Sequence, residues 1–146
     1  MTTLLEIRGL NTFYGESHIL RDVDLTVKAG EMVCLIGRNG VGKTTLLKSL
    51  IGLLRPRSGQ ISFDGKGLER AAPHQRAQAG LGYVPQGREI IPQLTVEENL
   101  LLGMEALPGG LGRNQRIDPI VYELFPVLQE FLPRKGGDLS GGQQQQ

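Results

Sequence analysis

The stretch Gly37-Arg38-Asn39-Gly40-Val41-Gly42-Lys43-Thr44 decides the fold class of this chain. It has a glycine, four free positions, a second glycine, a lysine and a threonine, which is the pattern of a phosphate-binding loop. The run Met-Val-Cys-Leu-Ile at 32–36 comes directly before it and is apolar throughout, as in a strand covered on both faces. Leucines at helical spacing follow it up to a stop near Gly52. A strand, a glycine-rich loop and a helix in this order predict a nucleotide-binding α/β fold.

Each residue type in this loop has a task in binding phosphate. Glycines allow the backbone to fold tightly enough for successive N–H groups to converge on phosphate oxygens. The loop leads to a helix N-terminus, whose free amides and dipole favour anions. Lys43 supplies a positive charge for the outer phosphates, and the Thr44 hydroxyl can ligate Mg²⁺. The alternative is a glycine-rich turn that contains lysine and threonine without binding a ligand.

The amino-acid composition limits the classes of protein to which this chain can belong. The 146 residues amount to one ordinary domain, and 39% hydrophobic with 21% charged residues can bury a core. The formal charge of +1 argues against a nucleic-acid-binding module, which carries a basic excess. No apolar run reaches the length of a transmembrane helix. The first eight residues lack the basic start of a signal peptide. Cys34 is the single cysteine. We expect a soluble cytoplasmic protein without a disulfide framework or a nucleic-acid partner.

Hydrophobic periodicity divides the chain into a strand-rich part and a helical part. Thr95 and Glu98 have the spacing of a capping box, Asp118-Pro119 is a helix start, and Pro126 must kink or divide the helix around it. We expect two domains, at 1–94 and 95–146. The pattern predicts strands over 4–10, 19–27, 32–36, 60–64 and 81–84, helices over 73–79, 95–102 and 117–132, and a glycine-rich loop over 107–113.

A second motif, Leu139-Ser140-Gly141-Gly142-Gln143, narrows the family. With the phosphate loop, it makes the chain resemble the nucleotide-binding subunits of ATP-binding cassette (ABC) transporters. Tyr14 stands where that family has its adenine-stacking aromatic residue, and Gln86, in Tyr-Val-Pro-Gln, matches the Q-loop glutamine. The resemblance implies an α/β fold of the P-loop NTPase type. Residues 1–94 would hold an N-terminal β-rich subdomain and half of a RecA-like core, and residues 95–146 a helical subdomain that ends at the signature.

The resemblance also implies how ATP and Mg²⁺ are bound. Two subunits pair head to tail, and each ATP lies between the phosphate loop of one and the signature of the other. Lys43, Gln86 and Ser140 are the implied catalytic residues, and Thr44 and Gln86 the implied metal ligands. The implied ATP-binding residues are Tyr14, Gly37, Arg38, Asn39, Gly40, Val41, Gly42, Lys43, Thr44, Thr45 and Gln86, while Leu139, Ser140, Gly141, Gly142 and Gln143 would contact the ATP of the second subunit.

The implied partners are a second ATP-binding subunit, in a heterodimer, and membrane permease subunits that hold the chain at the inner face of the cell membrane. The stretches 83–89 and 94–100 resemble the importer branch that serves branched-chain amino acids and urea or short amides. The run 136–146 resembles the urea-type ATPase more closely, which favours urea over branched-chain amino acids. Two other classes remain. A non-transport ABC ATPase is disfavoured by the short separation of Gln86 and Ser140, and a non-catalytic module that occupies a permease stays open.

The second half of the family's motifs is not found in these residues. The Walker B strand, its adjacent glutamate and the switch histidine would follow the signature, so we expect a truncated copy that binds nucleotide weakly and hydrolyses none alone. The run 32–36 would then expose an apolar edge. Residues 143–146 are expected to be the first turn of a cut helix rather than a low-complexity tail.

Several residues have a plain structural alternative to a functional role. Tyr14 could be a half-buried aromatic residue at a strand end, and Gln86 a loop residue bonded to backbone. Glu97 and Glu98 are expected to be helix-start charges rather than paired acids. The remaining candidates are expected to be structural or solvated: Cys34 in the core, His18 and His74 without metal-ligand spacing, and Arg55 and Arg57 in solvent.

Overall fold

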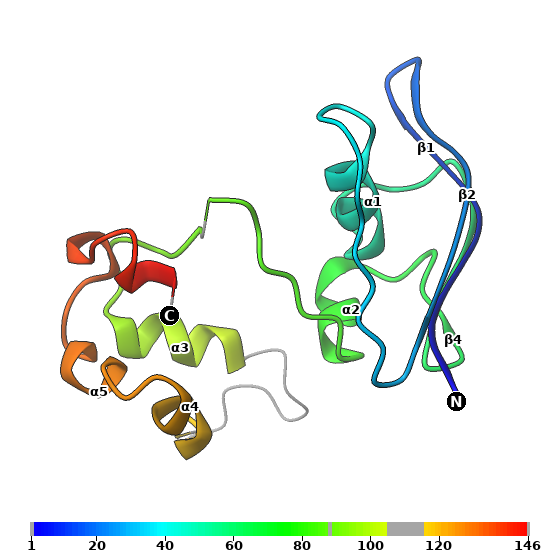
Figure 1. The fold of residues 1–146 in the computed structure, drawn as a ribbon. Helices are drawn as coiled ribbons and strands as arrows, with labels where there is room; N and C mark the ends of the chain where they lie inside the picture. Colours follow the sequence, from blue (N-terminus) through cyan, green and yellow to red (C-terminus); the bar gives the residue numbers. More distant parts are fainter. Residues whose placement is uncertain (1, 88, 105–115, 146) are drawn as a thin grey trace. The chain divides into compact units, whose positions relative to one another are not determined.

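The computed structural model describes residues 2–87, 89–104 and 116–145 (Figure 1). They form two compact units, Met1–Gly82 and Tyr83–Gln146. The domain boundary expected after residue 94 stays a prediction. Among the described helices, none has the length and apolar character needed to cross a membrane.

The first unit is built on a four-stranded antiparallel sheet. Its strands are β1 (Thr3–Tyr14), β2 (Ser17–Lys28), β3 (Ser58–Phe63) and β4 (Lys66–Gly67), in the order β2-β1-β3-β4. Alternate residues of β2 are exposed and half-buried from Val23 onward, which confirms the alternation seen in the sequence. The strands predicted at 4–10, 19–27 and 60–64 are therefore present, and the first two are longer than predicted.

Two helices accompany this sheet. Helix α1 (Lys43–Leu50) directly follows the phosphate-loop stretch, and helix α2 (Pro73–Gln78) begins with a proline in its first turn. The Thr12 and Ser49 hydroxyls, both fully buried, lie 3.1 Å apart and join β1 to α1. The core of the unit consists of Ile7, Leu10, Leu20, Leu46, Leu50, Ile61 and Leu68.

Two predicted strands are absent. Residues 32–36 and 81–84 have no regular secondary structure, and the side chains of Met32 and Ile36 are 96% and 87% exposed. Cys34 is also exposed, so its assignment to the core was wrong. An all-apolar strand is stable when neighbouring strands and helices cover both of its faces. No described strand pairs with residues 32–36, so the run is exposed, although not as the edge of a strand as expected.

The second unit is helical. It contains α3 (Val96–Gly103), α4 (Pro119–Leu124), α5 (Leu128–Phe131) and the short 3-10 helices η2 (Gly136–Asp138) and η3 (Gln143–Gln145). Its core is formed by Val96, Leu128 and Leu139. Pro126 separates α4 from α5, as predicted. The glycine-rich loop predicted over 107–113 lies outside the described residues.

Both predicted helix starts in this unit are confirmed. The Glu98 backbone N–H donates to Thr95 Oγ1, and the Thr95 N–H donates to Glu98 Oε2 at 2.7 Å, which completes the capping box. Hydrogen bonds from the Thr95 backbone and hydroxyl lower the pKa of Glu98. Asp118 caps α4 by accepting from the Ile120 N–H. Glu97 and Glu98 are thus charges in the first turn of a helix, as expected.

Candidate functional site

The backbone of the phosphate-loop stretch folds around the ammonium of Lys43. Lys43 Nζ donates to the carbonyl oxygens of Gly37 at 2.6 Å and Arg38 at 2.7 Å. Lys43 is also the first residue of α1, so its charge lies at the positive end of the helix. The loop thereby gathers a cation and the free N–H groups of a helix N-terminus at one place, which is the arrangement that attracts an anion.

Gly42 shows why this loop needs glycine. It is the N-cap of α1 with φ 102°, a conformation that other L-residues rarely adopt. A Cβ atom at this position would lie 2.9 Å from Leu20 Cδ2 and 3.2 Å from Ile19 Cγ2. The loop therefore approaches β2 more closely than any side chain would permit, and this contact sets the position of the start of α1.

The two threonines after Lys43 differ in accessibility. Thr44 is exposed in the first turn of α1, where its hydroxyl is available to a ligand. Thr45 is buried, and its carbonyl accepts from the Ser49 hydroxyl at 2.8 Å. Of the two, only Thr44 presents a side chain to solvent beside the loop. Arg38, Asn39, Gly40 and Val41 are exposed along the loop itself.

Tyr14 is the last residue of β1 and is 48% exposed. Side chains alternate along a strand, so Tyr14 shares a face with Thr12, whose hydroxyl contacts Ser49 of α1. That face carries the helix which the phosphate loop begins. Figure 1 draws the β1–β2 hairpin and the loop before α1 at the same end of the unit. Tyr14 therefore belongs to the same part of the first unit as Lys43.

Gln86 and the signature belong to the second unit. Gln86 is exposed in a turn with Gly87. In the signature, Leu139 is buried, while Ser140, Gly141 and Gly142 are exposed. Ser140 N–H donates to Gln143 Oε1 at 2.9 Å and the Gln143 N–H to Ser140 Oγ at 3.4 Å, so Ser140 caps the turn that follows. The helical turn expected over 143–146 is present at Gln143–Gln145 in 3-10 form.

Asn99 organises the segment after Gln86, a role that sequence reasoning missed. Its Nδ2 donates to the carbonyls of Ile91, Leu94 and Thr95 at 3.1, 3.3 and 2.9 Å, and its Oδ1 accepts from the Ile91 N–H at 2.9 Å. Asparagine is a poor helix former, because its amide competes for nearby backbone groups. An asparagine inside the predicted helix was therefore the feature of the sequence that could have indicated this role.

Backbone hydrogen bonds join this segment to the residues that lead into the signature. Gly136 N donates to Leu94 O at 2.9 Å and Gly137 N to Pro92 O at 3.0 Å. A Cβ at Gly136 would lie 3.3 Å from Asn99 Nδ2, so this glycine permits the close contact. Residues 91–95 and the residues before the signature are thus joined in one hydrogen-bonded framework inside the second unit.

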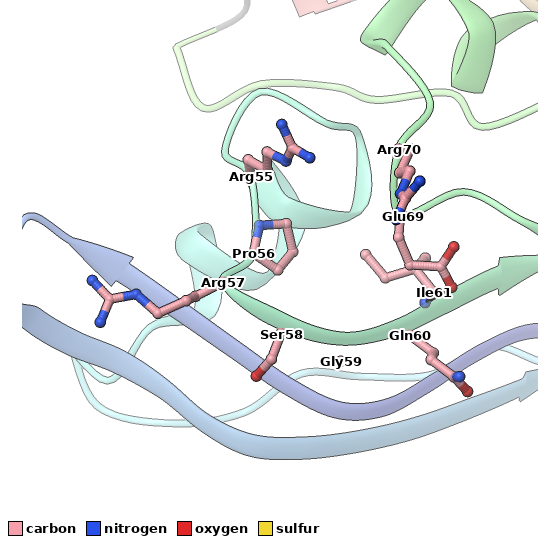
Figure 2. Close-up of a pocket in the computed structure, with 9 residues that line it drawn as sticks. All are labelled: Arg55, Pro56, Arg57, Ser58, Gly59, Gln60, Ile61, Glu69 and Arg70. Carbon is pink, nitrogen blue, oxygen red and sulfur yellow. Dashed lines mark hydrogen bonds between the residues drawn. The ribbon is translucent and has the colours of Figure 1, made fainter.

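The described residues contain no group of three or more His, Cys, Asp or Glu side chains able to hold a metal ion. Arg55, Arg57 and Arg70 line a cavity of about 460 Å³ in the first unit. Figure 2 shows their side chains pointing in different directions rather than toward a common point. Arg55 and Arg57 are exposed, as expected, although Arg57 also contacts an aromatic ring.

Comparison with known proteins agrees with this geometry. Residues 20–146 match the family model described as "ABC transporter". The chain is 41% identical over 142 residues to the probable branched-chain amino acid transport ATP-binding protein LivF of Archaeoglobus fulgidus, covering 97% of this chain and 59% of the relative. It is 37% identical to the high-affinity branched-chain amino acid transport ATP-binding protein BraG of Pseudomonas aeruginosa, covering 97% and 60%.

A solved structure has the same fold. It is a dimeric ATP-binding cassette in a post-hydrolysis state with ADP and Pi, and it matches with a TM-score of 0.81 and 27% identity over 97% of this chain and 66% of the cassette. The chain thus spans about three fifths of the length of the curated relatives it matches.

Proposed function

This chain belongs to the ABC transporter family, and we propose on that premise that its first unit binds the phosphates of Mg·ATP and that the chain is the ATP-binding part of an importer. The observation that carries the proposal is the Lys43 ammonium held inside the loop, 2.6 Å from the Gly37 carbonyl, at the N-terminus of α1. Family membership supports ATP as the nucleotide.

The groups around the loop fit a magnesium nucleotide. Lys43 would exchange its two carbonyl contacts for phosphate oxygens, which are stronger acceptors because they are charged. The exposed Thr44 hydroxyl would ligate Mg²⁺, which neutralises phosphate charge when bound. The N–H groups of the first turn of α1 would donate to the phosphates at the positive end of the helix. Tyr14, on the strand face that carries α1, would stack on the base.

Titration of the chain with Mg·ATP tests this proposal. Lys43→Ala is expected to weaken ATP binding by at least about tenfold, because it removes the charge that contacts the phosphates. The matched control is Lys48→Ala, which removes a lysine from the last turn of the same helix. Equal ATP affinity in the Lys43 and Lys48 variants would contradict a phosphate-binding role for the loop.

The motif residues bind and position, but none of them supplies a general base. Lys43 and Thr44 are a cation and a hydroxyl, and Gln86 and Ser140 are neutral. Loss of a general base costs about 10²–10⁴ in rate. We therefore expect this chain alone to turn over ATP at least about 10²-fold more slowly than a cassette that has a general base. Mg²⁺-dependent turnover at the rate of such a cassette, lost in Lys43→Ala, would refute this expectation.

The proposed partners rest on the exposed residues of the signature and on family membership. Ser140 and Gly142 are exposed at the start of a helical turn, where a hydroxyl and an amide can donate to phosphate oxygens. They would contact the ATP of a second subunit in a head-to-tail pair, which we propose to be a heterodimer. Permease subunits would hold the pair at the cytoplasmic face of the cell membrane, with the helical unit toward the permease.

For the transported solute we propose urea or a related small amide, on the resemblance of the run 136–146 to the urea-type ATPase. Branched-chain amino acids are the second candidate, which the names of two relatives favour. Overproducing the chain in cells that import both solutes separates the candidates, because a non-hydrolysing copy would occupy its own permease. Uptake of labelled urea is expected to fall while leucine uptake stays unchanged. The reverse pattern would favour branched-chain amino acids, and no change in either would count against a permease-binding module.

A further inference from the structure

The β1–β2 hairpin carries a stacked cluster on the face opposite Tyr14. Phe13 is next to Tyr14 in β1, so their side chains point to opposite faces of the strand. Phe13 pairs with His18 across the hairpin, and Tyr14 pairs with Ser17. The connecting turn is short and includes Gly15 at φ 55°. Any group that holds the Phe13 ring therefore also holds the backbone from which Tyr14 projects.

Phe13 is held between two side chains. The His18 ring is parallel to it within 9°, with ring centroids 4.0 Å apart. The guanidinium carbon of Arg57 lies 3.8 Å from the same ring centre. Two planar groups cannot both approach one ring centre within 4.0 Å from the same side without overlapping. His18 and Arg57 therefore cover opposite faces of Phe13, and Figure 2 shows the Arg57 side chain pointing away from that of Arg55.

Hydrogen bonds attach this stack to strands β1 and β2. His18 Nε2 lies 2.8 Å from Asn11 Oδ1, and Asn11 Nδ2 donates to Asp22 Oδ1 at 2.8 Å. The Arg57 N–H donates to the Asn11 carbonyl at 2.8 Å, which fixes the residue that precedes β3 against β1. This backbone contact places Arg57 beside β1, where its guanidinium lies over the Phe13 ring.

We infer that Phe13, His18 and Arg57 form a support that orients Tyr14, and that Arg57 is thereby a positioning residue for recognition of the nucleotide base. This inference rests on the proposed function, because it assumes that Tyr14 stacks on the base of ATP. A stacking side chain that is already held in its bound orientation loses less conformational freedom on binding. Removing the support leaves the phosphate-binding groups untouched and weakens only the contact with the base.

Two probes separate the base from the phosphates. ATP contacts both Tyr14 and the loop, whereas inorganic tripolyphosphate with Mg²⁺ contacts the loop alone. Tyr14→Ala is expected to weaken ATP binding by about tenfold, the size of one aromatic–base stack, and to leave tripolyphosphate unchanged. Arg57→Ala is expected to weaken ATP by about threefold, also without an effect on tripolyphosphate. The ratio of the two dissociation constants is the readout, because general destabilisation would weaken both ligands alike.

Two further variants complete the test. Arg55→Ala removes an exposed arginine from the same turn and is expected to leave the ratio unchanged. His18→Phe preserves a flat ring against Phe13 and is expected to retain the wild-type ratio, whereas His18→Ala lowers ATP affinity alone.

The outcomes distinguish this inference from the proposed function. Equal ratios in Arg57→Ala and Arg55→Ala, or a loss of both ligands in Arg57→Ala, would overturn the support. An unchanged ATP affinity in Tyr14→Ala would overturn it as well, while the phosphate loop could still bind tripolyphosphate. Failure of the wild-type chain to bind either probe would overturn the proposed function together with the inference.

Discussion

Replacing Arg76 by methionine is expected to lower the free energy of unfolding of the first unit by about 3 kcal/mol. Arg76 lies on α2 and is 2% exposed, the most fully buried cation in the described part of the chain. Its Nη1 donates to the carbonyls of Ser49 and Leu50 at 2.8 and 2.7 Å, and its Nε to the carbonyl of Ala71 at 2.9 Å. Ser49 and Leu50 end α1, so the guanidinium completes the C-terminus of the helix that begins at the phosphate loop.

The size of the expected loss in unfolding free energy depends on which carbonyl oxygens lose a hydrogen-bond donor. The Ser49 carbonyl keeps a backbone bond from the Gly52 N–H, so its loss is small. The Leu50 and Ala71 carbonyls would each lose a charged donor, at about 1.5–3 kcal/mol per bond. Burial lowers the pKa of Arg76, while Glu69 raises it, so part of the gain from its hydrogen bonds is offset by the cost of desolvating the charge. Methionine has a long, flexible side chain without hydrogen-bond donors, so it fills most of the space that the arginine leaves and adds little cost for an empty cavity.

Urea denaturation followed by far-UV circular dichroism measures this loss. A decrease of this size shifts the unfolding midpoint by on the order of 1–3 M. Arg70→Met is the matched control, because Arg70 lines a cavity of about 180 Å³ together with Arg76 but is exposed. It is expected to change stability by less than about 0.5 kcal/mol. If the Arg76 and Arg70 variants unfold at the same urea concentration, the buried guanidinium makes no net contribution and the reasoning is wrong.

Four further outcomes are expected. Thr95 lowers the pKa of Glu98 in the folded state, so the ionised Glu98 carboxylate stabilises α3 above the ordinary pKa of 4.5, and this stabilisation is lost as the pH falls through the lowered pKa. NMR titration of the Glu98 carboxyl checks the direction of the shift. The variant Glu98→Gln should remove this part of the pH dependence of stability. Gly42→Ala is expected to cost about 1–3 kcal/mol and to weaken ATP binding, because φ 102° and the contact with β2 both exclude a Cβ; unchanged binding would show that the loop can relax. Asn99→Ala should raise amide hydrogen exchange at 91–95 and in the signature but not in α1, which mass spectrometry can resolve by peptide. Ile36→Lys should reduce light scattering on storage without a change in the urea midpoint, since this side chain is exposed and packs on no core; a lower midpoint would mean that residues 32–36 are buried in solution.

Local sequence was sufficient for the features that depend on residues close together along the chain. The capping box at Thr95, the cap at Asp118 and the division at Pro126 each involve neighbours within four residues, and all three are present. The course of the phosphate loop into α1 belongs to the same group, because Lys43 contacts carbonyls five and six residues before it. The family and the fold also follow from these short motifs.

The features that the sequence did not predict depend on contacts between residues far apart in the chain. An apolar run at 32–36 predicted a buried strand, but burial depends on which strands and helices lie beside it, and hydropathy contains no information about them. The same holds for Arg76, which reads as a surface cation on a short helix until the end of α1 is placed against it. The contact of Arg57 with Phe13 likewise joins residues that are far apart in the chain. The sequence by itself therefore determined the motifs, caps and breaks, whose energies come from adjacent backbone, whereas the tertiary structure decided which charges and rings are buried, because burial is a property of packing between separate segments.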